Sequence, residues 1–351
     1  MKQISKKGKI TLISIASVIV ILAIIIASIN IHFSVLGGKI QVGEAVGYAW
    51  SETDSFDTQK SHKLDMGESD YKVLVLTDIH LKNHGTFAKE LGINYLLDGV
   101  SDIAIDKLVK KTNPDLILVL GDSVLTDRND IEYERFVKNM DSYKRPWACV
   151  FGNHDDEGRA DKAKLVDVLK TSEYGLFEYG PNDLHGAGNY LIELQRNGNT
   201  QQAMFMLDSG SSLEFPEKTE GINEKQIKWY EWNMQALAEN NGGVAPKNMA
   251  FFHIPLPQYS SLDNFEQGDR GEDSCPQNGS GDFFDSMKKF NGTHIFVGHD
   301  HSNNFITTYD GIKLAYATKS SYNCYFKSGM TGGTLLTIDT QNNVKEEIIL
   351  F

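Results

Sequence analysis

Short apolar runs alternate with polar, helix-forming stretches through the first half of this chain. Three runs stand at 72–77, 115–120 and 147–151, and helical patterns at about 96–108 and 129–140 separate them. Continuous runs of five or six apolar residues are typical of strands whose two faces are both covered, as in parallel sheets. This β, loop, α order predicts an α/β fold in which polar groups gather beyond the carboxyl ends of the strands.

The second half of the chain continues the same kind of domain. We expect strands at 189–194, 203–207, 249–252, 294–297, 305–309, 313–317, 333–338 and 344–350, and helices at about 161–170 and 223–238. The segment 256–282 is long, polar and rich in glycine, which is uncommon inside a compact domain unless the segment is a lid or a binding loop.

The amino terminus has a different pattern. A basic stretch precedes an uncharged apolar run at 10–29, and twenty residues at ~1.5 Å each span the ~30 Å hydrocarbon layer. The run has no small-x-small exit, which favours an uncleaved anchor over a cleaved signal peptide or a buried helix. We predict a cytoplasmic basic segment at 1–9, a transmembrane anchor at 10–30, a membrane-proximal spacer at 31–70 and a catalytic domain at 71–351.

Positive charge gathers before this span, because four lysines precede it and only Lys39 follows soon after. This asymmetry predicts a single-pass protein with a cytoplasmic amino terminus and an extracellular or lumenal domain. Residues 1–39 hold five lysines and no acids, so the formal net charge of −13 becomes −18 for the remainder. Such an acidic body makes nucleic acid an unlikely partner, and the sequence predicts no protein partner.

The three cysteines do not form a thiolate metal site by their spacing. Cys149 stands inside the apolar run 147–151 and is expected to be a small core residue. Cys275 and Cys324 both stand in loop-like segments, and whether they form a disulfide in an exported domain stays open.

Side chains that bind metals follow five of the predicted strands. They are Asp78 and His80, Asp122, Asn153 beside His154, His253, and His299 with His301. A lone histidine at a strand end is more often a structural residue, but this set at one edge of a sheet favours a site for two divalent metal ions. Carboxylate, amide and imidazole ligands together suit Mn, Fe, Zn or Mg, and Asp122 on the central strand is the natural bridging ligand.

The chain resembles the calcineurin-like metallophosphoesterases in the order of its motifs, from about residue 71 to 340. These motifs are Asp78-Ile-His80, Gly121-Asp122, Gly152-Asn-His-Asp155, His253 and Gly298-His-Asp-His301. The stretches FFHIPLPQY, GNHDDEG and VGHDH are similar to the purple-acid-phosphatase-like branch found in plants and fungi. The resemblance implies a four-layer αββα fold, which is a β-sandwich flanked by helices.

The resemblance also implies a role for each matching residue. One metal ion would be held by Asp78, His80, Asp122 and His301, and the other by Asp122, Asn153, His253 and His299. His154 would be the general acid that faces the leaving group, and Asp155 would orient it. The implied reaction is hydrolysis of a phosphate ester through attack by a water or hydroxide between the two metals.

One departure from the family pattern changes the expectation. True purple acid phosphatases carry a tyrosine three residues after the equivalent of Asp122 and lack a histidine at the position of His80, whereas this chain has Leu125 and His80. We therefore expect a non-purple member. Small phosphomonoesters, phosphodiesters, nucleotides and phospholipid headgroups all remain as substrates, and a non-catalytic binding or sensing ectodomain on the same fold remains the alternative function.

Overall fold

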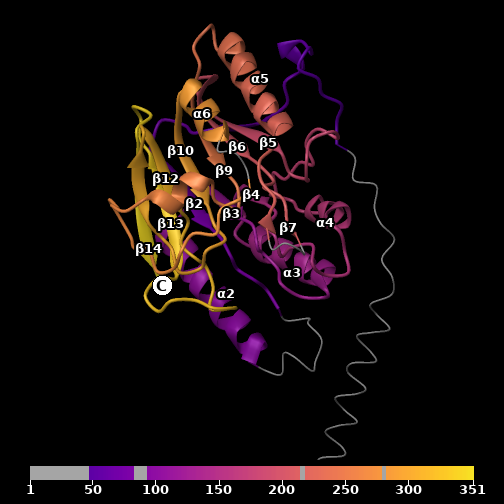
Figure 1. Cartoon of the computed structure of the whole chain (residues 1–351), viewed down its shortest axis with the longest axis vertical. Coiled ribbons are helices and arrows are strands. Elements are labelled where there is room, and N and C mark those ends of the chain that lie inside the picture. Colours follow the sequence, from indigo (N-terminus) through magenta and orange to yellow (C-terminus); the bar gives the residue numbers. More distant parts are fainter. Residues whose placement is uncertain (1–46, 83–92, 214–217, 279–281) are drawn as a thin grey trace, which may run out of the picture.

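A computed structural model describes residues 47–82, 93–213, 218–278 and 282–351 (Figure 1). The predicted cytoplasmic segment at 1–9 and the predicted anchor at 10–30 lie outside these residues. Within the described ranges, no helix combines the length and the apolar character that a membrane crossing needs.

Every strand and helix predicted for the domain is present within a few residues of its expected bounds, and the described residues add three short strands and one short helix. The strands are β1 (His62–Asp65), β2 (Tyr71–Leu76), β3 (Leu116–Leu120), β4 (Trp147–Val150), β5 (Tyr190–Arg196), β6 (Asn199–Met206), β7 (Ser212–Leu213), β8 (Lys218–Thr219), β9 (Lys247–Phe251), β10 (Gly292–Val297), β11 (Ile306–Tyr309), β12 (Ile312–Tyr316), β13 (Gly332–Ile338) and β14 (Val344–Leu350). The helices are α2 (Ile93–Thr112), α3 (Asn129–Asp141), α4 (Lys162–Leu169), α5 (Glu224–Asn240) and α6 (Asp282–Lys289), with short 3-10 turns η1 (Phe56–Thr58) and η2 (Pro257–Ser261).

Two large sheets carry the strands that lead to the predicted ligands. The five-stranded sheet has the order β14-β13-β2-β3-β4, and β2, β3 and β4 are parallel to one another. The seven-stranded sheet has the order β1-β5-β6-β9-β10-β12-β11, with β6, β9 and β10 parallel. Because parallel strands end at the same edge, each sheet presents the residues that follow its strands along one edge.

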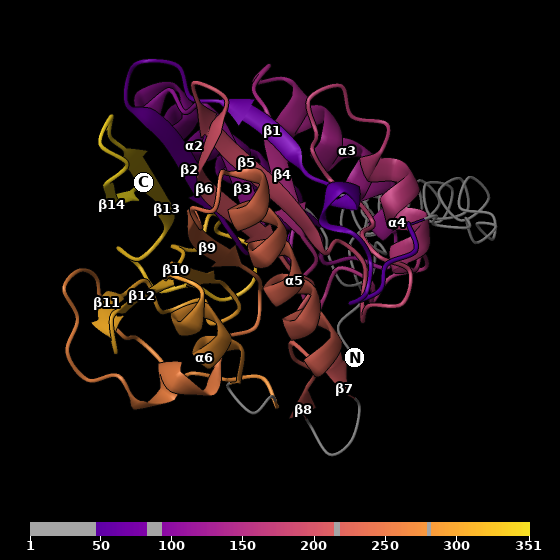
Figure 2. The same ribbon diagram turned by 90° about the horizontal axis from the view of Figure 1, so that it is seen from above.

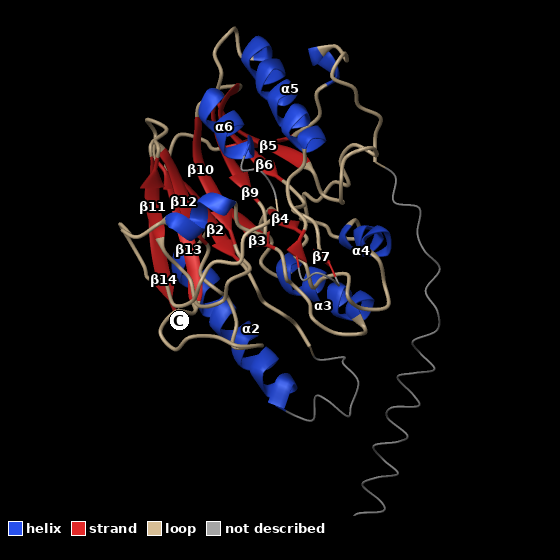
Figure 3. Ribbon diagram, in the orientation of Figure 1, coloured by secondary structure: helices blue, strands red, loops and turns tan. Residues whose placement is uncertain are grey.

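The sheets pack face to face, and helices cover their outer sides (Figures 2 and 3). Phe251 stacks on Phe296 with ring centroids 5.3 Å apart in the core that both sheets share. The next residue, Phe252, points the other way and contacts Phe283 of α6 at 5.9 Å. This alternation buries both faces of β9 and explains its continuous apolar sequence. With α2 packed on β2 and β13, the predicted α/β fold with two sheets flanked by helices is confirmed.

The predicted spacer differs from the structure over its second half. Strand β1 pairs in parallel with β5, with His62 opposite Ile192, and the rings of Trp50 and Phe56 contact Trp232 of α5 at 6.1 and 5.7 Å. The sequence signal is weak because β1 is a short edge strand whose residues alternate between half-buried and exposed. Residues 50–65, which the sequence analysis places in the spacer, therefore pack against the folded domain.

The segment 256–282 is less loop-like than the sequence predicts. Tyr259 in η2 is fully buried, and its hydroxyl donates a hydrogen bond to the carbonyl of Ile295 over 2.8 Å. Helix α6, which the sequence analysis does not predict, begins where this segment ends and buries Phe283, Phe284 and Met287. Eight residues are too few for a sustained helical period, so only the tertiary contacts identify this helix.

Candidate metal centre

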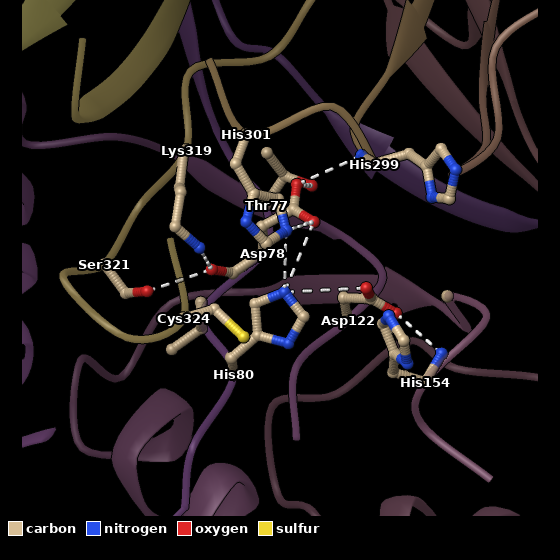
Figure 4. A network of polar contacts seen from close by, with 12 residues as sticks. Thr77, Asp78, His80, Asp122, His154, His299, His301, Lys319, Ser321 and Cys324 are labelled. Atoms are coloured by element: carbon tan, nitrogen blue, oxygen red, sulfur yellow. Dashed lines mark hydrogen bonds and ion pairs between the residues drawn. The ribbon is translucent and has the colours of Figure 1, made fainter. Parts of the chain in front are cut away.

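The seven predicted ligands come together where strands of both sheets end, and Figure 4 shows five of them, Asp78, His80, Asp122, His299 and His301. The five-stranded sheet supplies Asp78 and His80 after β2, Asp122 after β3 and Asn153 after β4, and the seven-stranded sheet supplies His253 after β9 and His299 and His301 after β10. We call Asp78, His80 and His301 the first ligand group, and Asn153, His253 and His299 the second ligand group. Asp122 lies between the two groups.

The first ligand group and Asp122 form one compact cluster. All four residues are buried, and one ligand atom of each lies within 4.8 Å of the others. Nε2 of His301 lies 3.3 Å from Asp78 Oδ1, and it lies 2.9 Å from Nε2 of His80. Although Asp78 Oδ1 is buried, it has no hydrogen-bond partner among the described residues. Unpaired carboxylate oxygen and facing imidazole nitrogens fit a divalent cation.

The second ligand group approaches Asp122 from the other side. Nδ1 of His253 lies 2.7 Å from the carbonyl oxygen of Leu120, to which it can donate. Its Nε2 lies 3.3 Å from Asp122 Oδ2 and, in the described part of the chain, has no hydrogen-bond partner. The His299 Nδ1 atom lies 2.8 Å from Asn153 Oδ1. A carbonyl that fixes one ring nitrogen and leaves the other directed at the site is the usual support for a metal-binding histidine.

Four of the predicted ligands have left-handed backbone conformations. The φ angles are 54° for Asp78, 50° for His80, 50° for Asp122 and 78° for His299. Such values are uncommon for residues other than glycine and concentrate at functional sites, where the surroundings hold them in place. Here the turns after β2 and β3 support one another, because the His80 amide donates to the Asp122 carbonyl over 2.9 Å.

Two glycines of the motifs are needed for close approach. A Cβ atom at Gly152 would collide with Oδ1 of Asp122, and one at Gly298 would collide with the hydroxyl of Thr77 and lie 2.9 Å from Oδ2 of Asp78. Each glycine therefore leaves room for a carboxylate of the cluster, Gly152 for that of Asp122 and Gly298 for that of Asp78.

Burial and charge set the protonation of the cluster. Burial, helped by the Lys319 ammonium, lowers the pKa of His80 to about 3, and burial with the nearby His253 lowers the pKa of His299 to about 4. Burial also acts to lower the pKa of His253, but Asp122 outweighs it and raises this pKa to about 10. His80 and His299 are therefore neutral and can offer lone pairs, whereas a cation bound at His253 must displace a proton.

Asp155 does not orient His154, contrary to the sequence prediction. Its Oδ2 accepts hydrogen bonds from the amides of Asp122 over 2.9 Å and Gly152 over 2.7 Å. The carboxylate beside His154 is that of Glu157, whose Oε2 lies 2.8 Å from Nδ1 of His154. Asp155 thus joins the turns after β3 and β4. The position of Glu157, three residues after His154, is the sequence feature that could have identified it as the partner of His154.

His154 lies beside the ligands with its ring partly exposed. Its amide donates to Oδ1 of Asp122 over 2.9 Å, and the His154 and His80 ring centroids are 5.8 Å apart. Burial acts to lower the pKa of His154, but the interaction of its ring with the Glu157 carboxylate and the charge of Asp122 outweigh burial and raise the pKa. A histidine that keeps its proton at the edge of a cation site can act as a general acid.

A loop after β12 supports the first ligand group, and the sequence analysis does not single it out (Figure 4). Lys319 Nζ and the Ser321 hydroxyl both donate to the carbonyl of Asp78, over 2.8 and 3.0 Å. Burial lowers the pKa of Lys319 to about 8. Cys324 lies in the same loop, and no disulfide joins it to Cys275, so the pairing that the sequence leaves open is not formed.

The chain is similar in sequence to known proteins of yeast and plants. The chain is similar to "Phosphatase DCR2" of Saccharomyces cerevisiae, with 26% identity over 288 residues, 74% of this chain and 48% of the yeast protein. It is also similar to "Probable inactive purple acid phosphatase 29" of Arabidopsis thaliana, with 27% identity over 296 residues, 74% of each protein. The chain spans about half the length of the yeast relative. A solved dimetal phosphatase of Danio rerio is 11% identical, with a TM-score of 0.49 over 79% of this chain and 98% of that one.

A family model described as calcineurin-like phosphoesterase matches residues 71–303. This region contains all seven predicted ligands together with His154, and the similarity to plant and yeast relatives agrees with the non-purple branch that the motifs resemble. Because the match covers well over half of the sequence, the chain belongs to the calcineurin-like phosphoesterase family.

Proposed function

We propose that this protein is a binuclear metal-dependent phosphoesterase that hydrolyses phosphate esters. One observation carries the proposal: Oδ2 of Asp122 lies 3.5 Å from Nε2 of His80 in the first ligand group and 3.3 Å from Nε2 of His253 in the second. A carboxylate that faces two separate sets of ligands is the feature that a two-metal site requires.

The two groups would hold one divalent cation each and share Asp122. The donors are carboxylate oxygen, amide oxygen and imidazole nitrogen, without cysteine, which suits Mn, Fe, Zn or Mg. Bound cations supply Lewis-acid activation of water and neutralise charge on the phosphoryl oxygens. The protein's own part is to hold Asp78, Asp122 and the histidines rigidly, since the buried turns around them leave little freedom.

His154 would protonate the departing oxygen of the substrate. Its ring is partly exposed at the edge of the cluster, and Glu157 stabilises its charged form. Its backbone amide donates to Oδ1 of Asp122. This hydrogen bond would hold the acid beside the ligands without making His154 a ligand itself. General acid catalysis matters most for esters whose alkoxide is a poor leaving group.

The test is metal analysis of the full chain together with a panel of chromogenic phosphomonoesters and phosphodiesters in the presence of Mn²⁺. We expect about two metal ions per chain and hydrolysis of at least one ester class, both lost in Asp122→Asn. Stoichiometric metal without hydrolysis of any ester would instead support a binding ectodomain, and the names of the Arabidopsis relatives contain the word "inactive". The same panel separates monoester from diester preference.

We also propose that residues 10–30 anchor the protein, with residues 1–9 in the cytoplasm and the catalytic domain outside or in a lumen. The support is the twenty-residue uncharged run and the lysines that precede it. Protease added to intact cells should degrade the domain while a cytoplasmic marker survives. Survival of both would show that the orientation is wrong.

A further inference from the structure

Helix α2 exposes large apolar side chains along one side. Leu96 is 65% exposed, Val100 43% and Ile103 58%, while Ile105 and Leu108 of the same helix are buried in the core. A helix that is apolar on two faces has enough apolar surface to pack against a second partner besides its own sheet. Contiguous exposed apolar surface on a soluble domain marks an interaction site.

This side of α2 continues onto the carboxyl terminus of the chain. Leu350, Phe351 and Phe326 are 45%, 38% and 41% exposed, and the ring of Tyr322 lies 5.5 Å from that of Phe326 and 5.7 Å from that of Phe351. Figures 1 and 2 both show the carboxyl terminus beside α2. We call Leu96, Val100, Ile103, Phe326, Leu350 and Phe351 the α2 patch.

A hollow of about 330 Å³ lies within the α2 patch. Val100, Ile103, Leu350 and Phe351 line it together with other residues of α2 and with Tyr322. The hollow gives the patch a concave centre, with room for apolar groups of a partner.

The α2 patch shares a loop with the metal centre. Tyr325, next to Phe326, stacks on the ring of His301 with centroids 4.2 Å apart, and its carbonyl lies 2.9 Å from Nδ1 of His301. In the same loop, the amide of Tyr322 donates to the hydroxyl of Ser101 on α2 over 2.9 Å. A surface that covers the patch therefore lies beside the metal centre.

Charge around the patch favours an anionic partner. Lys107 and Lys111 line the hollow, and both are exposed on α2. They stand on a body whose formal net charge, without residues 1–39, is −18. Lysines near an apolar helix face are the usual means by which a domain attracts anionic lipid.

The length of chain before the structure limits how far the domain can lie from a bilayer. Seventeen residues separate the apolar run 10–29 from residue 47, where the described chain begins. Fully extended, they span at most ~60 Å. A domain tethered by this run remains close enough to the membrane for any of its faces to touch it, and the α2 patch combines exposed apolar side chains with two lysines.

We propose that the α2 patch docks on the anionic phospholipid surface of the membrane that the proposed anchor at 10–30 would cross. Leu96, Val100 and Ile103 enter the boundary between headgroups and acyl chains, at the ~5 to 10 Å depth of interfacial helices. The metal centre then opens beside the headgroup layer. The inference rests on the proposed anchor at residues 10–30, and it does not depend on hydrolysis of phosphate esters.

The test uses two single tryptophan substitutions in the full chain, Ile103→Trp in the patch and Val244→Trp as the matched control. Val244 is 64% exposed and precedes β9, at the opposite ends of the strands from the metal centre. Each variant is reconstituted into vesicles of phosphatidylcholine and phosphatidylserine with or without brominated acyl chains, and the wild-type signal is subtracted. We expect the added fluorescence at position 103 to lose most of its intensity to bromine, with a blue shift, and that at 244 to change little.

Equal quenching at the two positions would overturn the proposal, because the tether alone brings both residues near the bilayer. So would recovery of the chain in the vesicle-free fraction. The competing occupant of the patch is a second copy of the chain. It would be supported if position 103 is not quenched and the chain is a dimer in detergent. The combined change Leu96→Ser, Val100→Ser and Ile103→Ser should then convert that dimer to a monomer. Hydrolysis of a soluble nitrophenyl phosphate by the same variants is a separate readout, so failure of docking is distinguishable from failure of the enzyme.

Discussion

The two ligand groups of the metal centre are built differently. The first has its own carboxylate, Asp78, whose backbone carbonyl accepts from a buried ammonium and a hydroxyl. The second offers an amide and two imidazoles, so its only negative charge is that of the shared Asp122. Charge count is a main determinant of affinity for a hard cation. The second group should therefore depend on Asp122 more completely than the first does, although both depend on it.

The substitution Asp122→Asn should remove this shared charge and have the largest effect. We expect occupancy of both groups to fall together and kcat to fall by ~10³-fold or more, beyond the usual loss of a single preorganised electrostatic element. Metal content per chain and steady-state kinetics measure the two quantities. Retention of one metal ion per chain would mean that Asp122 belongs to one group only.

His154 belongs to neither group, so His154→Ala should slow hydrolysis without removing metal. The loss should be ~10²- to 10⁴-fold for an alkyl phosphate, whose leaving group needs a proton. It should be far smaller for a nitrophenyl ester, whose phenolate leaves unaided. If metal disappears with the histidine, His154 is a ligand, and if the two substrates suffer alike, it is not the acid.

Changing one residue of each group separates their metal sites. Asp78→Asn should weaken cation binding at the first group, and Asn153→Ala should weaken binding at the second by a comparable ~10- to 100-fold, while the other group keeps its metal. Titration of metal-free variants with Mn²⁺ should then show one tight and one weak site. Two equally weakened sites in either variant would contradict the division into two groups.

The smallest effect should come from Glu157→Gln, which touches neither ligand group. Because Glu157 raises the pKa of His154, its loss should lower that pKa, so that less of the acid form is present near neutral pH and hydrolysis of alkyl esters slows, with the alkaline limb of the pH profile moved to lower pH. Metal content should stay unchanged. The matched control is Asp155→Asn, which should instead lower metal content, since Asp155 holds the amides of Asp122 and Gly152.

The sequence predicts that the seven candidate ligands lie together, because each follows an apolar strand that is easy to recognise. Parallel topology brings Asp78 and Asp122 to one edge of the five-stranded sheet, and the packing of the second sheet adds His253. The partner of His154 depends on how two turns pack side by side, which no local pattern records, and so Asp155 is assigned wrongly. The sequence analysis does not identify Lys319 for a similar reason, because its contact with the carbonyl of Asp78 joins residues 241 positions apart.

The metal centre should also stabilise the packing of the two sheets. Asp78 and Asp122 extend from the five-stranded sheet, whereas His253 and His299 extend from the seven-stranded sheet. Cations bound by residues of both sheets would cross-link the two sheets at the end where these strands stop. Ligands that bind only the native state add their binding free energy to its stability. A chelator should therefore stop hydrolysis and also lower the stability of the fold, because the two sheets would no longer be cross-linked at that end.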